Sequence, residues 1–182
     1  ATLWSTLSPN TLTIAEHVTW WLALGLILLF LPYFPYSKHA HLFMGPLNIM
    51  ASEKRRSMAA IETIDFEDEE LDQFGAAQIQ HLPQTQLLDG YACIQCSRCQ
   101  DACPAYETGK ELSPSALEIN KRYFINDNLS TIANGESIDK ALTDWMLTEE
   151  AAWSCTTCGY CVEVCPVGNE PMIDILRARQ NL

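Results

Sequence analysis

Residues 93–104, CIQCSRCQDACP, and residues 155–166, CTTCGYCVEVCP, repeat the pattern Cys-x-x-Cys-x-x-Cys-x-x-x-Cys-Pro and contain all eight cysteines of the chain. This is the ligand pattern of proteins that bind two 4Fe-4S clusters. The first three thiolates of each run hold one cluster, and the fourth, next to proline, holds the other. We therefore predict one cluster held by Cys93, Cys96, Cys99 and Cys165, and a second held by Cys155, Cys158, Cys161 and Cys103.

Zinc sites and disulfides are the alternative interpretations of these cysteines. Structural zinc sites usually pair two Cys-x-x-Cys knuckles, and a third cysteine three residues on, repeated with the same proline, fits them poorly. Disulfides form in oxidising compartments, whereas cysteines crowded into two short windows suit soft-metal ligation in a reducing one. Neither run lacks a ligand, so a 3Fe-4S cluster is not expected.

A membrane-spanning helix is predicted for residues 18–37, VTWWLALGLILLFLPYFPYS, which contain no charged residue. A helix of this length spans a bilayer core of about 30 Å. Trp20 and Trp21 lie toward one end and Tyr33 and Tyr36 toward the other, as aromatic anchors at the headgroups do. The alternative is a buried core helix, but residues 1–60 offer little else that could bury it.

The flanking charges predict the orientation of this helix. Residues 1–17 contain no Lys or Arg, whereas Lys38, Lys54, Arg55 and Arg56 follow the span. The positive-inside rule then places the N-terminus outside and both cysteine runs on the cytoplasmic side of the inner membrane. A signal peptide is a poor alternative, because the stretch lacks a basic n-region and a small-residue cleavage site.

The charge distribution suggests how the chain is divided. The formal net charge is -12, and residues 62–72, ETIDFEDEELD, carry seven acids and no base, which is typical of a solvated linker. So acidic a domain does not suit nucleic acid. We predict an extracytoplasmic segment over 1–17, a transmembrane helix over 18–37, a juxtamembrane segment and acidic linker over 38–74, and a dicluster domain over 75–182.

The predicted fold class is mostly α, since no alternating strand pattern of useful length is present. Ser113 and Pro114 have the chemistry of a helix start, with Leu117, Ile119, Tyr123, Phe124 and Ile125 as its apolar contacts. A second helical stretch is predicted from Ile138 to about Trp153, and a third from Met172 to Leu182. Trp145 and Trp153 are interpreted as core residues and not as electron relays.

The cysteine runs and their surroundings resemble a known family. Residues 87–114, LLDGYACIQCSRCQDACPAYETGKELSP, and residues 153–172, WSCTTCGYCVEVCPVGNEPM, are similar to the alpha-helical ferredoxin domain of heterodisulfide-reductase-like iron-sulfur proteins. The resemblance covers about residues 75–182. It implies the cofactor and leaves the substrate open. The Cys-Cys-Gly motifs that build the disulfide-cleaving site of that family are missing from the sequence.

The membrane end carries a second resemblance. Residues 34–48, FPYSKHAHLFMGPLN, are similar to the end of a heme-bearing helix in the gamma subunit of respiratory nitrate reductase. That pattern has two histidines 18 residues apart; His41 matches one, but Ala23 stands at the other position. His41 is therefore either a ligand of heme b, whose opposing ligand must come from partner helices, or an interfacial histidine that meets lipid headgroups or the ferredoxin domain.

The predicted function is electron transfer without catalysis by the chain itself. The expected partners are the membrane, a cytochrome b-like or quinone-binding membrane subunit, and a cytoplasmic flavin or iron-sulfur subunit. The alternatives are a share in a catalytic quinone or heterodisulfide reductase completed by partners or further chain, and an assembly anchor whose clusters only stabilise the fold. Candidate residues that tune the clusters are Arg98, Asp101, Thr156, Thr157 and Gly159.

Overall fold

The computed structural model describes residues 8–52, 67 and 73–182. Two compact units divide the chain, residues 1–40 and residues 41–182. Apart from Glu67, the acidic run predicted as a linker lies outside the described residues, as do the cations at positions 54–56.

The first unit is dominated by helix α1 (Pro9–Tyr33). Ser8 caps it, because its hydroxyl accepts a hydrogen bond from the backbone N–H of Thr11, and Pro9 occupies the first turn. The helix therefore begins nine residues before the predicted start at residue 18. The short 3-10 turns η1 (Phe34–Tyr36) and η2 (Lys38–Ala40) follow it. With Phe34–Tyr36 included, the helix is long and apolar enough to cross a membrane.

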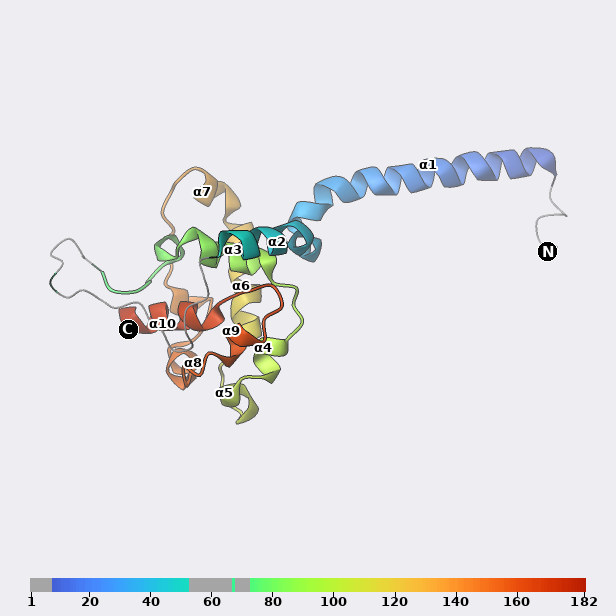
Figure 1. Cartoon of the computed structure of the whole chain (residues 1–182). Helices are drawn as coiled ribbons and strands as arrows, with labels where there is room; N and C mark the ends of the chain where they lie inside the picture. The colour runs from blue at the N-terminus through green and yellow to red at the C-terminus, as the bar shows by residue number, and fades with distance from the viewer. Residues whose placement is uncertain (1–7, 53–66, 68–72) are drawn as a thin grey trace. The chain divides into compact units, whose positions relative to one another are not determined.

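The second unit consists of short helices joined by loops (Figure 1). No strand occurs among the described residues, where Gln78 and Ala141 form an isolated bridge. The predicted mostly helical fold is thus confirmed. The elements are α2 (His41–Ala51), η3 (Ile79–His81), α3 (Gln84–Ala92), α4 (Arg98–Asp101), α5 (Pro104–Glu107), α6 (Pro114–Asp127), α7 (Leu129–Ala133), η4 (Leu142–Asp144), α8 (Glu149–Ser154), α9 (Tyr160–Glu163) and α10 (Pro171–Asn181).

Helix α6 lies at the centre of this unit, in contact with α3, α4 and α10 (Figure 1). Its predicted start is confirmed, since the Ser113 hydroxyl accepts a hydrogen bond from the Ala116 N–H at 3.1 Å. Leu117 and Ile125 are buried as expected, but Tyr123 is exposed. The remainder of the buried face includes the charged side chains Glu118, Lys121 and Arg122, which the sequence pattern did not predict.

The continuous helix predicted from Ile138 to Trp153 is wrong. Residues 136–140 have no regular structure, η4 covers a single turn, and α8 starts only at Glu149. Tertiary hydrogen bonds explain the interruption, because the Leu142 N–H binds the Ala77 carbonyl at 2.8 Å. Thr148 then caps a new helix through the Ala151 N–H.

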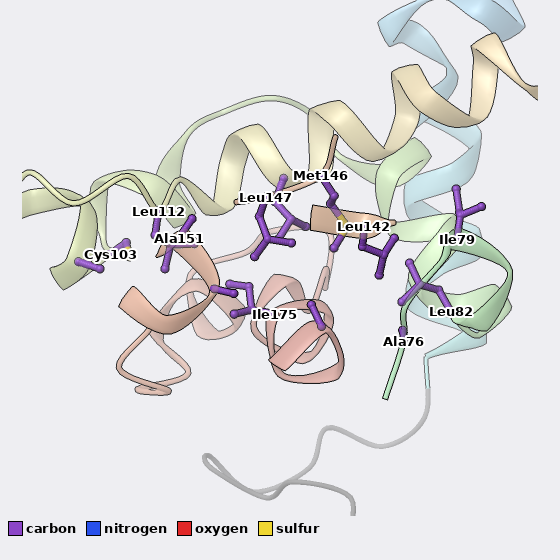
Figure 2. Close-up of a cluster of buried hydrophobic side chains, with 14 of the residues drawn as sticks. Ala76, Ile79, Leu82, Cys103, Leu112, Leu142, Met146, Leu147, Ala151 and Ile175 are labelled. Atoms are coloured by element: carbon purple, nitrogen blue, oxygen red, sulfur yellow. The ribbon is translucent and has the colours of Figure 1, made fainter. Parts of the chain in front are cut away.

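The main core is a band of apolar side chains that runs from Cys103 to Ala76 and Leu82 (Figure 2). Leu142, Met146 and Ile175 are among its fully buried members. Trp145 packs against this core and stacks on Phe124, with 3.9 Å between ring centroids. Trp153 was predicted to be core but is exposed, and its ring lies under the Arg179 guanidinium. In the short helix α8, Ala151 and Ala152 take the inward positions and turn the next residue outward.

Helix α2 belongs to the second unit, although the sequence assigned it to a juxtamembrane segment. It packs against α3, and its Asn48 side chain is buried. The border between the units therefore falls at Ala40 and His41, inside the segment predicted over residues 38–74.

Gly75 lies against α10, before the first cysteine run, and is expected to tolerate no side chain. Its φ is +65°, and an added Cβ would lie 2.1 Å from the Arg177 carbonyl oxygen. Gly75→Ala should therefore destabilise the fold by about 2–4 kcal/mol, from backbone strain and overpacking together. Gly109→Ala is the matched control, because its φ is +78° but no atom lies within 4 Å of the added Cβ. Thermal unfolding of both variants measures the difference, and equal losses would contradict the steric argument.

Candidate iron-sulfur site

The two cysteine runs adopt the same backbone conformation. Each follows the end of a helix, α3 before Cys93 and α8 before Cys155. Each then has left-handed residues at two equivalent positions, Gln95 and Ser97 in the first run and Thr157 and Gly159 in the second. Only Gly159 adopts this conformation without a steric cost. Gly159, one of the candidate tuning residues, has a φ of 73° and therefore serves the geometry of the loop.

The fourth cysteine of the second run lies with the first three of the other run. Cys93, Cys96, Cys99 and Cys165 line one small cavity, together with Cys161 and Arg98. Helix α4 carries Cys99, and the loop after α9 carries Cys165, and these two helices are in contact. The arrangement brings together the four residues that the sequence assigned to one cluster.

The electrostatic interactions between thiols group the cysteines into the same two predicted sets, apart from one interaction between the sets. The pKa of Cys99 is raised to about 12, mainly by burial and in addition by the nearby Cys93, Cys165 and Cys96. Burial also raises the pKa of Cys161 to about 12, with contributions from Cys155, Cys158 and Cys103.

One further interaction links the two groups, since Cys99 also raises the pKa of Cys161. The facing side chains therefore come from α4 and α9. Cys96 and Cys158, the second cysteines of their runs, are exposed to solvent.

The donor set fits thiolate-bound iron-sulfur clusters. Among the described residues, which include all eight cysteines, no three His, Cys, Asp or Glu side chains converge closely enough to hold a single metal ion. A zinc ion would need its sulfur ligands at about 2.3 Å from one point. When bound here, a cluster would supply a one-electron carrier, and the thiols that hold it would have to lose their protons.

Backbone N–H groups donate to sulfur atoms of both cysteine runs. The Thr157 N–H lies 3.4 Å from Cys155 Sγ, and the Asn169 N–H lies 3.3 Å from Cys165 Sγ. Such bonds tune cluster potential. Thr157, a predicted tuning residue, donates through its backbone, whereas a contact from Asn169 was not predicted. Arg98 lines the cysteine cavity, but Asp101 and Thr156 are exposed.

Arg179 of α10 holds the start of the second cysteine run. Its guanidinium donates hydrogen bonds to the backbone carbonyls of Ala152, at 2.6 Å, and of Cys155. It also lowers the pKa of the Cys155 thiol, against the larger upward effect of burial. This role could not be predicted from the sequence, because an Arg near the end of a helix usually lies on the surface.

A buried polar cluster of Asn48, Asp89 and Asn169 joins α2, α3 and the loop after Cys165. Asn48 Nδ2 donates to Asp89 Oδ1 at 2.7 Å, and Asn169 Nδ2 donates to the Asp89 carbonyl at 2.6 Å. The Glu170 N–H binds the other Asp89 carboxylate oxygen at 3.0 Å. Burial nevertheless raises the pKa of Asp89 to about 6. These contacts fix the segment that carries Cys165.

A second buried cluster contains ionisable groups. Lys121 Nζ lies 2.5 Å from Asp174 Oδ2 and 3.1 Å from Glu118 Oε2, and all three side chains are almost fully buried. Burial by itself lowers the pKa of Lys121, but the nearby carboxylates raise it above its usual value. Burial raises the pKa of Glu118 to about 8. Glu118 also lines the cysteine cavity, so this charge cluster borders the site.

His41, the predicted heme ligand, is the first residue of α2 and is partly buried. Residue Ala23, at the position of the second histidine in the resembled pattern, lies in α1 in the other unit. A heme role for His41 therefore stays a prediction.

The comparisons with known proteins agree with this site. Residues 89–169 match the family model described as a 4Fe-4S dicluster domain. In an alignment that covers 91% of its length, the chain is 35% identical to the probable iron-sulfur-binding oxidoreductase FadF of Bacillus subtilis. In an alignment that covers its whole length, it is 28% identical to the EtfAB:quinone oxidoreductase of Syntrophomonas wolfei. Over 78% of its length it is 26% identical to a probable membrane-anchored ferredoxin of Chromohalobacter salexigens.

These relatives are much longer proteins. The chain spans 28% of the length of each of the first two and 25% of the third. No solved structure matches the chain significantly. The paired cysteine runs and these similarities together show that residues 89–169 resemble a 4Fe-4S dicluster domain and that the chain is similar to a part of iron-sulfur oxidoreductases.

Proposed function

We propose that the chain is the membrane-anchored electron relay of a respiratory-type oxidoreductase, with one 4Fe-4S cluster held by each of the predicted sets of four cysteines. The observation that carries this proposal is the arrangement of the thiols. Cys99 and Cys161 interact electrostatically across the two sets, whereas Cys96 and Cys158, one from each set, are exposed to solvent. An electron could thus enter through the exposed part of one set and leave through that of the other.

The membrane end of the relay is supported by α1 and by the names of the relatives. The helix is apolar, and none of its residues is buried within the first unit. The relatives include a quinone oxidoreductase and a membrane-anchored ferredoxin. We infer a quinone or a heme at the membrane end and a cytoplasmic flavin or iron-sulfur subunit at the other. The clusters would then lie on the cytoplasmic side, as the flanking cations favour.

A redox titration of the full chain in lipid nanodiscs, followed by electron paramagnetic resonance, tests the relay. We expect two clusters that are reduced reversibly and broaden each other's signals, because they share one small domain. Without partner proteins, a chemical reductant should reduce the clusters, but steady turnover of a water-soluble quinone should be absent. Catalytic turnover by the chain alone would favour the reductase alternative. Clusters that cannot be reduced reversibly would favour a structural role.

A further inference from the structure

Helix α2 exposes an apolar face within the second unit. Leu42, Phe43, Leu47 and Met50 are 58%, 65%, 49% and 81% exposed. They recur at helical spacing, so they lie on one side of the helix. Exposed apolar patches of this kind on soluble proteins mark protein or membrane interaction sites.

The sequence around α2 favours lipid as the occupant of this face. Only residues 34–40 separate α2 from the end of α1, so even a fully extended connection would reach no more than about 28 Å. Residues 39–52 contain no Asp, Glu, Lys or Arg, whereas Lys38 precedes them and one acid, Glu53, and then Lys54, Arg55 and Arg56 follow. Cations that flank an apolar helix suit a surface of anionic headgroups.

The opposite face of α2 is anchored beside one particular set of cysteines. Asn48, which is 1% exposed, donates hydrogen bonds to Asp89 of α3 and to the Val167 carbonyl at 3.3 Å. Helix α3 leads directly to Cys93, and Val167 follows Cys165 by two residues. Both cysteines belong to the set predicted for the first cluster. Whatever occupies the exposed face of α2 therefore lies closer to that set than to the other.

We propose that α2 is an interfacial helix whose exposed face is immersed at the boundary between lipid headgroups and acyl chains. It thereby makes the set of Cys93, Cys96, Cys99 and Cys165 the membrane-proximal one. The second set would then face the soluble partner. This assignment rests on the proposed membrane relay, to which it adds the order of the two sites along the electron path.

Photo-crosslinking of the full, cluster-loaded chain tests the position of α2. p-Benzoylphenylalanine replaces Phe43 or Leu47 in one pair of variants and Tyr123, a 53% exposed residue of α6, in a control. Each is irradiated in nanodiscs of phosphatidylethanolamine and phosphatidylglycerol. We expect phospholipid adducts, detected by mass spectrometry, at positions 43 and 47. At position 123 we expect none. Adducts mainly to protein would identify a protein-docking face instead, and yields equal to the control would place the face in water. Either result overturns the proposal.

The order of the two sites has its own readout. Cys158→Ala should retain the first cluster and Cys96→Ala the second, and the two variants change equivalent positions of the repeat. With nitroxide-labelled lipid headgroups in the nanodisc, the cluster signal of Cys158→Ala should relax faster than that of Cys96→Ala. The reverse order, or no difference, would contradict the assignment. Neither crosslinking nor relaxation requires electron transfer to a quinone, so a failed relay and a misplaced helix remain distinguishable.

Discussion

Replacing Cys96 and Cys165 together with alanine is expected to leave one 4Fe-4S cluster per chain, whereas replacing Cys96 and Cys103 together is expected to leave none. In the crossed arrangement, the first pair removes two ligands from one cluster, while the second pair removes one ligand from each. Both double variants lose the same number of thiols. Iron and acid-labile sulfide content, measured on anaerobically reconstituted protein, distinguishes the two results.

The second cysteine run provides the matched control for this experiment. Cys158→Ala combined with Cys103→Ala should leave one cluster, and Cys158→Ala combined with Cys165→Ala should leave none. If each run instead held its own cluster with its own four cysteines, every one of these results would be exchanged. The buried position of Cys103 within the main core makes the single Cys103→Ala variant the necessary reference for folding.

Lys121→Met is expected to destabilise the second unit by about 3–5 kcal/mol, because it leaves the Asp174 and Glu118 carboxyl groups buried without their cation. Methionine preserves most of the volume of the side chain, so the loss is electrostatic. The measurement is the thermal midpoint of the cluster-loaded protein, compared at one scan rate. Lys110→Met removes an exposed cation with the same change in net charge and should have little effect.

The pH dependence separates the electrostatic explanation from simple mispacking. The pKa of Glu118 is about 8 in the folded protein and ordinarily 4.5, so the folded state retains a proton that the unfolded chain releases. Stability due to this group is therefore lost as the pH rises from about 4.5 to about 8. Lys121 lowers the Glu118 pKa, so in Lys121→Met the loss should extend to higher pH. Adding Asp174→Asn should restore part of the stability; an unchanged pH profile and no restoration would contradict this account.

The helical class and the start of α6 could be predicted from the sequence because their signals are local. Ser113 and Pro114 cap and start a helix through atoms within a few residues. The interruption between residues 138 and 149 could not be predicted in this way, since the Ala77 carbonyl that binds the Leu142 N–H comes from a distant segment. Trp153 was misplaced for a related reason. Its type suggested burial, but the orientation of α8 is set by Ala151 and Ala152 in the core.

The residues around the cysteines were harder to predict than the cysteines themselves. Glu118 and Lys121 follow one another at helical spacing, which on most helices indicates a solvated ion pair. Their burial depends on Asp174, more than fifty residues away in α10. Asn48 and Asn169 carry no sequence signal for a role at the site, because their partner Asp89 is brought between them only by folding.

The sequence by itself determined the type of cofactor and its candidate ligands, because the spacing of thiols along a short loop is a local property that matches the size of a small cluster. Only the tertiary structure decided what surrounds those ligands. It buried the charges of Glu118, Lys121 and Asp174 beside the cysteine cavity and joined α2 to the first cysteine set through Asn48. Charge burial and helix docking depend on which distant segments meet, and that is settled when the chain packs.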